Sequence, residues 1–450
     1  MHSDLMRDAA ERGVRYLESL AERPVSASAE AVEALSALDG PLPEEGSAPE
    51  DVLALLDEHA SPATVASAGP RYFGFVTGGS LPAAAAANWL AGAWDQNAFS
   101  HISSPATAAV EDIALRWLVD TLNLSAGCGG AFVTGATMAN FAGLAAARHR
   151  LLDDAGWDVE ANGLFGAPEI TVIVGDEAHT MLFKSLGLLG FGRERVVRVP
   201  ADGQGRMRAD ALPEISGPTI LCLQAGNVNS GAFDPADEIC ARAKQAGAWV
   251  HVDGAFGLWA AAAPGRAHLM AGYDQCDSWA TDGHKWLNVS YDSGICVLRD
   301  GDALKASMAA TAAYLFPSEQ RDPFAYTPES SRRARGVEVW AVLKSLGRAG
   351  VADLIERNCR QALRFAEGLS EAGHDILNDV VLNQVMVSFG DDDKTRRVIA
   401  ALQEEGTCWC GGTQWHGGAA MRISVSSWAT TDDDVERSLD AMIRVAQRTV

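Results

Sequence analysis

Two short segments decide the fold that this sequence predicts: His251-Val-Asp253-Gly-Ala255 and, further along the chain, Thr281-Asp-Gly-His284-Lys285-Trp286. An apolar run that ends in Asp253 is typical of a buried strand whose carboxyl end opens into a polar turn. In an open parallel sheet, ligands bind at the carboxyl ends of the strands. We therefore expect Asp253 and Lys285 to lie at the same ligand-binding edge.

Short apolar runs alternate with helical patterns through the middle of the chain. The predicted strands cover residues 130–133, 170–174, 219–223, 249–252 and 294–298, and the predicted helices cover 106–122, 138–152 and 235–246. Strands that are regularly separated by helices form a mostly parallel sheet that is covered on both faces. The sequence therefore predicts an α/β fold, with a large domain over residues 69–312.

The segments on either side of this large domain have different patterns. Residues 1–68 contain helical patterns at 8–20 and 49–59 but no evident core of their own, which predicts a helical N-terminal arm. Residues 313–450 begin with a polar stretch and then combine helices with strands, which predicts a small C-terminal α/β domain. Its predicted elements are helices 337–346, 351–372 and 395–405 and strands 381–389 and 421–425.

Asp253 and Lys285 are the two ionisable groups that an enzyme dependent on pyridoxal phosphate needs most. A lysine amine can hold the cofactor covalently, and an aspartate can keep the pyridine nitrogen protonated, so that the ring withdraws electrons from the substrate's α-carbon. Each residue alone is as readily explained as a surface lysine or a helix cap. The two together, each beside a strand end, predict a pyridoxal phosphate site.

The motifs around His284-Lys285-Trp286 resemble those of the group II amino acid decarboxylases. These fold-type I enzymes include the decarboxylases of aromatic amino acids, glutamate, histidine and tyrosine. The resemblance runs from about Gly69 to the C-terminus, with the motifs in the family's order. It implies decarboxylation of an L-amino acid with pyridoxal 5'-phosphate as cofactor, and a homodimer in which the arm 1–68 packs on the neighbouring subunit.

The residues for the cofactor's phosphate follow the strand 130–133, where Thr134-Gly-Ala136-Thr137 opens a helix. Backbone amides at a helix N-terminus bind anions, although the same pattern also fits a plain turn in which Thr137 caps the helix. The family places the phosphate on the residues that match Ala136 and Thr137. Asp282 and His284 match family positions that contact the phosphate and the surroundings of the lysine.

Four further residues match positions around the pyridine ring. His179 matches the family histidine that stacks on the ring, Asp253 the partner of the ring nitrogen, and Ala255 a small residue packed against the ring. The family's Gly-Thr-Thr loop is replaced here, so Asn227 is only a candidate contact to the phenolic oxygen. Lys285 must be a neutral amine in order to attack, which requires burial or a cationic neighbour to lower its pKa.

Two residues are candidates for contact with the substrate. Arg422 lies in the last predicted strand, where the family places an arginine, and its guanidinium can bind a carboxylate through two hydrogen bonds. Tyr326 lies in the polar stretch that corresponds to a mobile family loop, whose tyrosine delivers a proton after carbon dioxide leaves. The spacing departs from the family's pattern, so Tyr314 is the alternative.

Two alternatives to decarboxylation remain open from the sequence. An aminotransferase or an aldolase-type lyase can use the same fold, because the bond that breaks is the one that stands perpendicular to the ring. A catalytically degenerate scaffold protein is the alternative outside the enzymes. Retention of Lys285, Asp253 and His179 together argues against the scaffold.

The composition excludes several other classes of function. With 36 basic and 59 acidic residues the net charge is -23, which disfavours nucleic acid and anionic lipid as partners. Residues 1–30 contain no apolar run of the signal-peptide type, and no segment approaches the length of a membrane span, so we expect a cytoplasmic protein. Cys408-Trp-Cys410 with His416 falls short of the four ligands of a zinc site, and no metal is expected.

Overall fold

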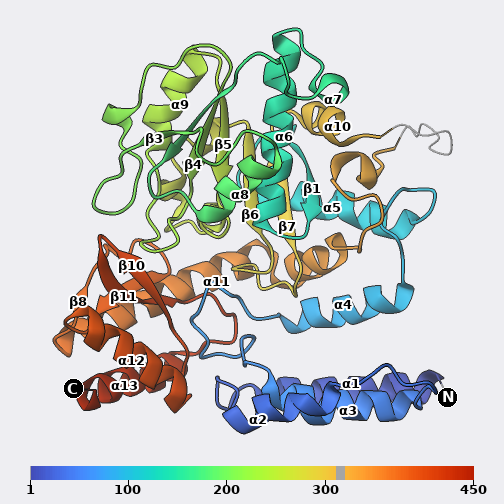
Figure 1. Cartoon of the computed structure of the whole chain (residues 1–450), viewed down its shortest axis with the longest axis vertical. Coiled ribbons are helices and arrows are strands. Elements are labelled where there is room, and N and C mark those ends of the chain that lie inside the picture. The colour runs from blue at the N-terminus through green and yellow to red at the C-terminus, as the bar shows by residue number, and fades with distance from the viewer. Residues whose placement is uncertain (1, 311–319, 450) are drawn as a thin grey trace. The chain divides into compact units, whose positions relative to one another are not determined.

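The computed structural model of the chain describes residues 2–310 and 320–449 (Figure 1). Contacts within the chain divide it into two compact units. The first, which we call the large-sheet unit, comprises Ser80–Leu363 and Asn378–Val385, and the second, the terminal unit, comprises Met1–Gly79, Arg364–Leu377 and Met386–Val450. The predicted division into 1–68, 69–312 and 313–450 stays a prediction.

The large-sheet unit is built on seven strands in the order β1-β7-β6-β5-β4-β2-β3. They are β1 (Gly129–Val133), β2 (Thr171–Gly175), β3 (Val197–Val199), β4 (Thr219–Gln224), β5 (Trp249–Asp253), β6 (Ser278–Asp282) and β7 (Gly294–Leu298). Strands β2 to β6 pair in parallel, whereas β7 is antiparallel to both β6 and β1. The predicted α/β class with a mostly parallel sheet is confirmed.

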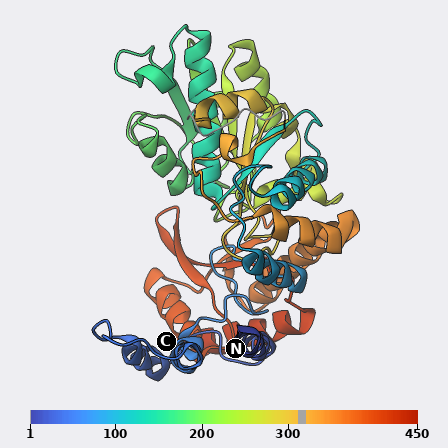
Figure 2. The same cartoon turned by 90° about the vertical axis from the view of Figure 1, so that its right-hand side faces the viewer.

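The large-sheet unit also contains several helices (Figures 1 and 2). They are α4 (Pro82–Trp94), α5 (Pro105–Thr121), α6 (Ala136–Asp154), α7 (Val159–Asn162), α8 (Thr180–Leu188), α9 (Ala236–Gln245) and α10 (Gly301–Met308). The main apolar core lies between the sheet and α6, whose buried residues are mostly small, with alanine the commonest. A Cβ atom on Gly143 would lie 2.8 Å from the His251 ring, so only glycine lets α6 approach β5 this closely.

The terminal unit combines a four-stranded sheet with helices from both ends of the chain. Its sheet has the order β10-β11-β9-β8. The strands are β8 (Asp375–Ile376), β9 (Gln384–Ser388), β10 (Gly411–Trp415) and β11 (Gly418–Ser424), and the helices are α1 (His2–Ser19), α2 (Ala29–Glu33), α3 (Pro49–Ala63), α12 (Asp392–Glu405) and α13 (Asp432–Arg448). Arg71 is 2% exposed and bonds to Asp434 at 3.0 Å, which ties the N-terminal segment to α13.

A long helical element, α11 (Gly336–Glu371), leads from the large-sheet unit into the terminal unit. The sequence predicts two helices here, at 337–346 and 351–372. Gly347 lies between them with φ of 60°, a left-handed conformation that glycine adopts without strain. The two predicted helices are therefore present as the two halves of α11. In the described part of the chain, no helix has both the length and the apolar character of a membrane span.

Candidate active site

The carboxyl ends of the parallel strands meet at one edge of the large sheet. Asp253 ends β5 and Asp282 ends β6, and the neighbouring registers place Gln224 opposite Asp253. The turns after β5 and β6 are joined through Ala255, whose carbonyl accepts from Asp282 N at 2.9 Å. The structure therefore brings Asp253, Ala255 and Asp282 together at the predicted edge.

The predicted phosphate cradle is the first turn of α6. Gly135 is its N-cap residue and offers no side chain to the free amides of the helix. The Ala136 amide instead donates to Asp282 Oδ1 at 2.6 Å. A Cβ atom on Gly294 would lie 2.4 Å from Gly135 Cα, so the cradle rests directly on the start of β7. The amide that is predicted to hold the phosphate thus already faces a negative group.

Asp282 connects this cradle to the lysine. Its carboxylate is 4% exposed; Oδ1 lies 3.5 Å from His284 Nε2, and Oδ2 lies 3.3 Å from Lys285 Nζ. The predicted residues Ala136, Asp282, His284 and Lys285 therefore form one cluster, drawn from the ends of β1 and β6.

The His284 ring is oriented by its neighbours. Its Nδ1 accepts from Ser293 N at 3.0 Å, which places the proton of the neutral ring on Nε2, facing Asp282. The ring stacks on Tyr291 with centroids 4.3 Å apart. Burial lowers the pKa of His284, and the charge of Asp282 partly offsets this effect. His284 is therefore held as a neutral donor.

Asp253 is a buried carboxylate whose charge is not balanced by a cation. The residue is 5% exposed, and its Oδ1 accepts only a long bond, 3.3 Å, from Ala255 N. Within residues 2–310 and 320–449, no cation forms an ion pair with it. Because a buried charge is costly unless it is paired, Asp253 is suited to a positively charged ligand group.

His179 and Asp253 line the same small pocket, together with Gln224, Cys222 and Asp234. His179 caps α8, and its Nδ1 accepts from Met181 N at 3.4 Å. This bond fixes the ring at the strand edge. The structure therefore brings together the two residues that are predicted to lie on the cofactor ring and at its nitrogen.

Asn227 is engaged within its own loop. Its Oδ1 accepts from Asn229 N at 2.8 Å and Ser230 N at 3.1 Å, and its Nδ2 donates to Gln224 Oε1 at 3.1 Å. The asparagine thus shapes the loop after β4, which explains why this residue type replaces a threonine here. Its contact to a cofactor stays a prediction.

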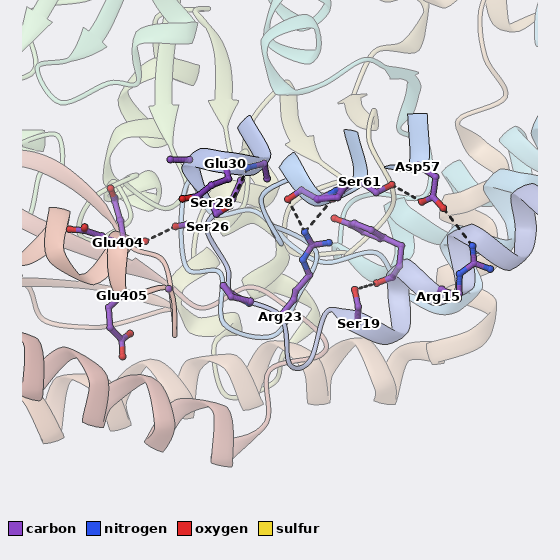
Figure 3. Close-up of a pocket in the computed structure, with 18 of the residues that line it drawn as sticks. Arg15, Ser19, Arg23, Ser26, Ser28, Glu30, Asp57, Ser61, Glu404 and Glu405 are labelled. Carbon is purple, nitrogen blue, oxygen red and sulfur yellow. Dashed lines mark hydrogen bonds and ion pairs between the residues drawn. The ribbon is translucent and has the colours of Figure 1, made fainter. Parts of the chain in front are cut away.

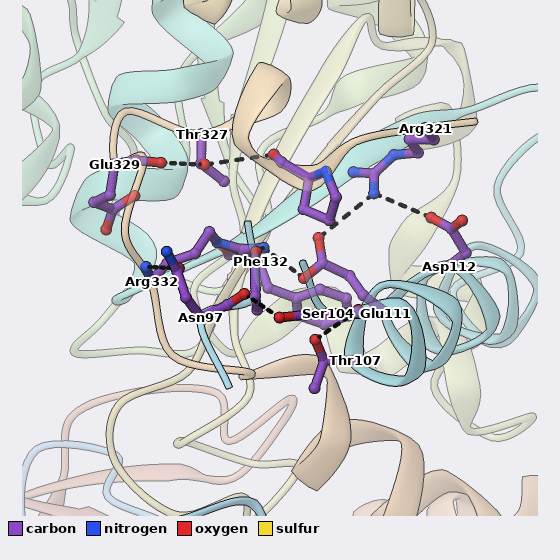
Figure 4. Close-up of polar contacts among 12 residues, drawn as sticks. Asn97, Ser104, Thr107, Glu111, Asp112, Phe132, Arg321, Thr327, Glu329 and Arg332 are labelled. Carbon is purple, nitrogen blue, oxygen red and sulfur yellow. Dashed lines mark hydrogen bonds and ion pairs between the residues drawn. The ribbon is translucent and has the colours of Figure 1, made fainter. Parts of the chain in front are cut away.

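Tyr326 packs in a different part of the large-sheet unit. Its ring lies under the guanidinium of Arg321, 4.3 Å from the centroid. Arg321 bonds to Asp112 at 3.1 Å (Figure 4). No contact that is described joins Tyr326 to the cluster at Lys285. Its role as proton donor stays a prediction, and Tyr314 lies outside the described residues.

Arg332, in the polar stretch that follows Tyr326, belongs to a buried ion-pair network. The Arg332 side chain is fully buried; it bonds to Glu111 at 2.7 Å and to the Phe132 carbonyl at 2.7 Å (Figure 4). Because Phe132 is in β1, this network fixes the strand that leads to Ala136. No pattern in this polar stretch indicates that its arginine would be buried.

Arg422 lies in β11 of the terminal unit, opposite Gly411 in β10. Burial lowers the pKa of its guanidinium, which nevertheless remains positively charged at neutral pH. The other predicted site residues belong to the large-sheet unit, so contact between Arg422 and a substrate stays a prediction.

A second, wide pocket opens in the terminal unit between α1, α3 and the end of α12 (Figure 3). Its charged lining is largely paired internally: Arg12 bonds to Asp57 at 2.8 Å, and Arg23 donates to the Ser61 carbonyl at 3.2 Å. None of the predicted site residues lines it. Across the residues that the structure describes, no group of three or more His, Cys, Asp or Glu side chains is arranged to hold a metal ion.

One polar network near the site was not predicted. His251 is fully buried in β5; its Nδ1 lies 2.7 Å from Ser278 Oγ, and its Nε2 lies 2.8 Å from Asn140 Oδ1. Because side chains alternate along a strand, His251 lies on the same face as Asp253. This spacing could have indicated that His251 lies near the site. Because Asn140 is in the first turns of α6, the network fixes the phosphate cradle relative to the strand of Asp253.

The burial of His251 is expected to lower the free energy of unfolding in acid. Burial lowers its pKa from 6.5 to about 3. The folded state is therefore fully favoured above pH 6.5 and loses stability as the pH falls from 6.5 towards 3, because only the unfolded chain takes up the proton. At pH 5 this loss amounts to about 2 kcal/mol.

We expect His251→Gln to be less stable than the wild type at pH 7.5 but to lose less between pH 7.5 and 5. Urea unfolding of the cofactor-free protein, followed by tryptophan fluorescence, measures both differences. The exposed His268→Gln serves as the control and should behave like the wild type. A His251 variant that keeps the wild type's full pH dependence would contradict the assignment.

The arrangement fits pyridoxal phosphate, the cofactor that the resemblance implies. A helix N-terminus whose N-cap residue Gly135 has no side chain, a buried carboxylate with no ion-pair partner among the described residues, and a lysine lie at one edge. Each corresponds to one part of the cofactor: phosphate, ring nitrogen and aldehyde. His179 lines the pocket beside the carboxylate. The residues at this edge thus supply all three kinds of contact.

Comparison with known proteins identifies the family. Residues 34–389 match the conserved domain of pyridoxal-dependent decarboxylases. Tryptophan decarboxylase 1 of Oryza sativa subsp. japonica is 28% identical over 424 residues, which cover 85% of this chain and 81% of the relative. L-2,4-diaminobutyrate decarboxylase of Rhizobium meliloti (strain 1021) is 30% identical over 388 residues, covering 81% and 75%.

Acidic amino acid decarboxylase GADL1 of Bos taurus is 28% identical over 302 residues, which cover 64% of this chain but only 57% of the relative. The match to the Mus musculus protein of the same name covers 54% of that relative. The chain thus spans little more than half the length of these two relatives.

Solved structures share the whole fold. The crystal structure of Oryza sativa TDC with PLP and tryptamine has a TM-score of 0.90 at 23% identity, covering 99% of this chain and 97% of that chain. The structure of mouse CSAD in apo form has a TM-score of 0.91 at 21% identity, covering 99% and 98%. The predicted fold is confirmed by these likenesses. By the match over residues 34–389, the chain belongs to the family of pyridoxal-dependent decarboxylases, whose cofactor is pyridoxal phosphate.

Proposed function

We propose that this protein decarboxylates an L-amino acid to the corresponding amine and carbon dioxide. The observation that carries the proposal is the meeting of Lys285, the uncompensated Asp253 carboxylate and the α6 N-terminus at one edge of the sheet. These three groups can hold the cofactor at its aldehyde, its ring nitrogen and its phosphate. The named relatives act on acidic, aromatic and diamino acids, so the family leaves the side chain of the substrate open.

The residues divide the work between binding and proton control. The Ala136 amide and Thr137 bind the phosphate, while His179 and Ala255 confine the ring. Asp253 holds a proton on the ring nitrogen, because its buried carboxylate gains a positive partner there. Bound pyridoxal phosphate supplies the electron sink for the electrons of the broken bond.

Lys285 binds the cofactor through its amine and releases it to the amine of the substrate. His284 and Asp282 hold the Lys285 amine in place, at the distances that the cluster shows. Asn227 shapes the loop beneath the ring. After carbon dioxide leaves, the α-carbon takes a proton from Tyr326, His179 or water.

Decarboxylation requires that the α-carboxylate, rather than the α-hydrogen, stands perpendicular to the ring. Transamination and aldol cleavage remain the alternative reactions on this fold, and the family match favours loss of the carboxylate. A degenerate scaffold is disfavoured because Lys285, Asp253 and the cradle at Ala136 are all retained at one edge of the sheet.

Incubation of the purified protein with a panel of amino acids tests this proposal. Carbon dioxide, amine and keto acid are measured separately, and the panel includes acidic, aromatic and diamino acids. We expect equal amounts of carbon dioxide and amine from at least one of them and no keto acid. Formation of keto acid without carbon dioxide would contradict decarboxylation and indicate transamination instead.

Arg422 is proposed to bind a carboxylate of the substrate. Loss of a charge-assisted hydrogen bond costs about 1.5 to 3 kcal/mol, so Arg422→Leu should raise KM by a factor of about ten or more. The spectrum of the bound cofactor should not change. The control is Arg444→Leu, because Arg444 is an exposed arginine of the same unit, paired with Glu405.

The panel also shows which carboxylate Arg422 binds. If only acidic substrates lose affinity, Arg422 holds a distal carboxylate. If every amino acid loses affinity alike, it holds the α-carboxylate. Kinetics equal to those of the Arg444 control would mean that Arg422 is structural.

A cytoplasmic homodimer completes the proposal. All eight cysteines are free, as expected in a reducing compartment. Apolar side chains remain exposed on α4 (Trp89, Leu90 and Trp94) and, separately, on α3 (Val52, Leu55 and Leu56). Such faces on a single chain favour burial against a second copy.

A further inference from the structure

Asp282 occupies the place where the cofactor's phosphate is proposed to bind. Its Oδ1 accepts from the Ala136 amide at 2.6 Å, a short bond from the first residue of a 19-residue helix. An amide carries a single hydrogen, so a carboxylate and a phosphate compete for it. We infer that Asp282 is an internal competitor of the phosphate and lowers the affinity of the chain for pyridoxal phosphate; this inference rests on the proposed function.

The packing around Gly135 supports the competition independently of that bond. A Cβ atom on Gly135 would lie 3.4 Å from Asp282 Oδ1 and 3.2 Å from His284 Cε1. The carboxylate therefore lies over the N-cap residue itself, in the space that faces the open end of α6. A phosphate can reach the same amide only after this carboxylate has moved.

Electrostatic repulsion strengthens the competition between the Asp282 carboxylate and the phosphate. The Asp282 side chain is 4% exposed, so solvent screens its charge poorly. A phosphate that carries close to two negative charges is repelled by a carboxylate beside it, whereas the positive end of the α6 dipole attracts both groups. When the Asp282 carboxylate occupies the helix N-terminus, it weakens the binding of the phosphate there, and a bound phosphate likewise repels the carboxylate.

The displaced carboxylate has two alternative partners in the same cluster. Oδ2 already lies 3.3 Å from Lys285 Nζ, and His284 Nε2 lies 3.5 Å from Oδ1. Asp282 can therefore give up the Ala136 amide and remain beside Lys285 and His284. In the cofactor-free protein Asp282 caps α6. In the protein with bound cofactor we expect it to contact only Lys285 and His284.

The test compares pyridoxal phosphate with pyridoxal, which lacks the phosphate, in the wild type and in Asp282→Asn. The asparagine keeps the shape but removes the charge. We expect the ratio of the two dissociation constants, measured by quenching of tryptophan fluorescence, to shift about tenfold in favour of pyridoxal phosphate in the variant. The ratio cancels any effect on Lys285, because both ligands carry the aldehyde.

A second measurement does not depend on the covalent bond. Inorganic phosphate should raise the melting temperature of the cofactor-free Asp282→Asn protein at lower concentration than it does for the wild type. Asp282→Ser provides a second variant without the carboxylate in case the asparagine variant does not fold. A matched control is Asp277→Asn, at the other end of β6, which should leave both readouts unchanged.

An unchanged ratio, or weaker binding of phosphate in both Asp282 variants, would overturn the inference and make Asp282 a positioning residue for the amide. Failure of the proposed function is recognised separately, because then the wild type itself would bind neither ligand covalently.

Discussion

Lys285→Ala is expected to abolish turnover and to remove the covalent bond to pyridoxal phosphate that borohydride makes permanent. Lys285 Nζ lies 3.3 Å from Asp282 in the cluster that faces the α6 N-terminus, and this amine is the only group proposed to bind the aldehyde. Without it, the substrate must react with free cofactor, and we expect a loss of at least about a thousandfold, or about 4 kcal/mol in the activation barrier.

The measurement is the mass of the borohydride-treated protein and of its peptides. In the wild type the added mass should map to the peptide that contains Lys285, and it should be absent from the variant. The control is Lys184→Ala, an exposed lysine of α8, which should keep both label and activity. Label on any other lysine of the wild type would refute the assignment.

Asp253→Asn is expected to keep the cofactor but to lose turnover by several powers of ten. The amide preserves the shape of a residue that is 5% exposed, yet it no longer favours the protonated ring nitrogen. Each tenfold loss corresponds to about 1.4 kcal/mol of transition-state stabilisation. Absorbance of the bound cofactor and steady-state kinetics give the two readouts.

A chemical complementation makes this second prediction specific. Pyridoxal phosphate methylated on the ring nitrogen carries a permanent positive charge, which does not depend on Asp253. It should recover part of the rate in the asparagine variant. Near-normal turnover of that variant with the ordinary cofactor would show that Asp253 is not the partner of the ring.

Several strands of the large sheet could be predicted because each of them is a largely apolar run. Gly294–Leu298 agrees with the predicted strand at both ends, and Thr171–Gly175 and Thr219–Gln224 agree within one residue. β6 was missed because Ser278–Asp282 mixes serine, threonine and aspartate, although every residue in it is buried. Its neighbours on both sides, β5 and β7, satisfy its backbone and bury it.

Several helices were not predicted, for reasons that depend on their surroundings. α13 has a strongly amphipathic sequence and a capping box at Thr431 and Asp434, signals that could have identified it. α8 is only nine residues long and mostly apolar, so its pattern does not separate it from a strand.

The roles of Asp253, His179 and Lys285 stay predictions, but their positions beside strand ends could be predicted from the sequence. The bonds among these residues could not. Nothing in the sequence shows that Asp282 bonds to the Ala136 amide, since the contact joins segments 146 positions apart. His251 was passed over for a similar reason, because its partners Asn140 and Ser278 come from two other elements.

The reaction itself is tested most directly with an amino acid from the panel that carries ¹³C in its α-carboxylate and deuterium on its α-carbon. Decarboxylation predicts that all the ¹³C leaves as carbon dioxide, while the deuterium stays in the amine beside one proton from solvent. Transamination would leave the ¹³C in a keto acid and lose the deuterium. Aldol cleavage, which requires a substrate with a β-hydroxyl group, would leave the ¹³C in glycine. Either of these outcomes, with no labelled carbon dioxide, would contradict the account.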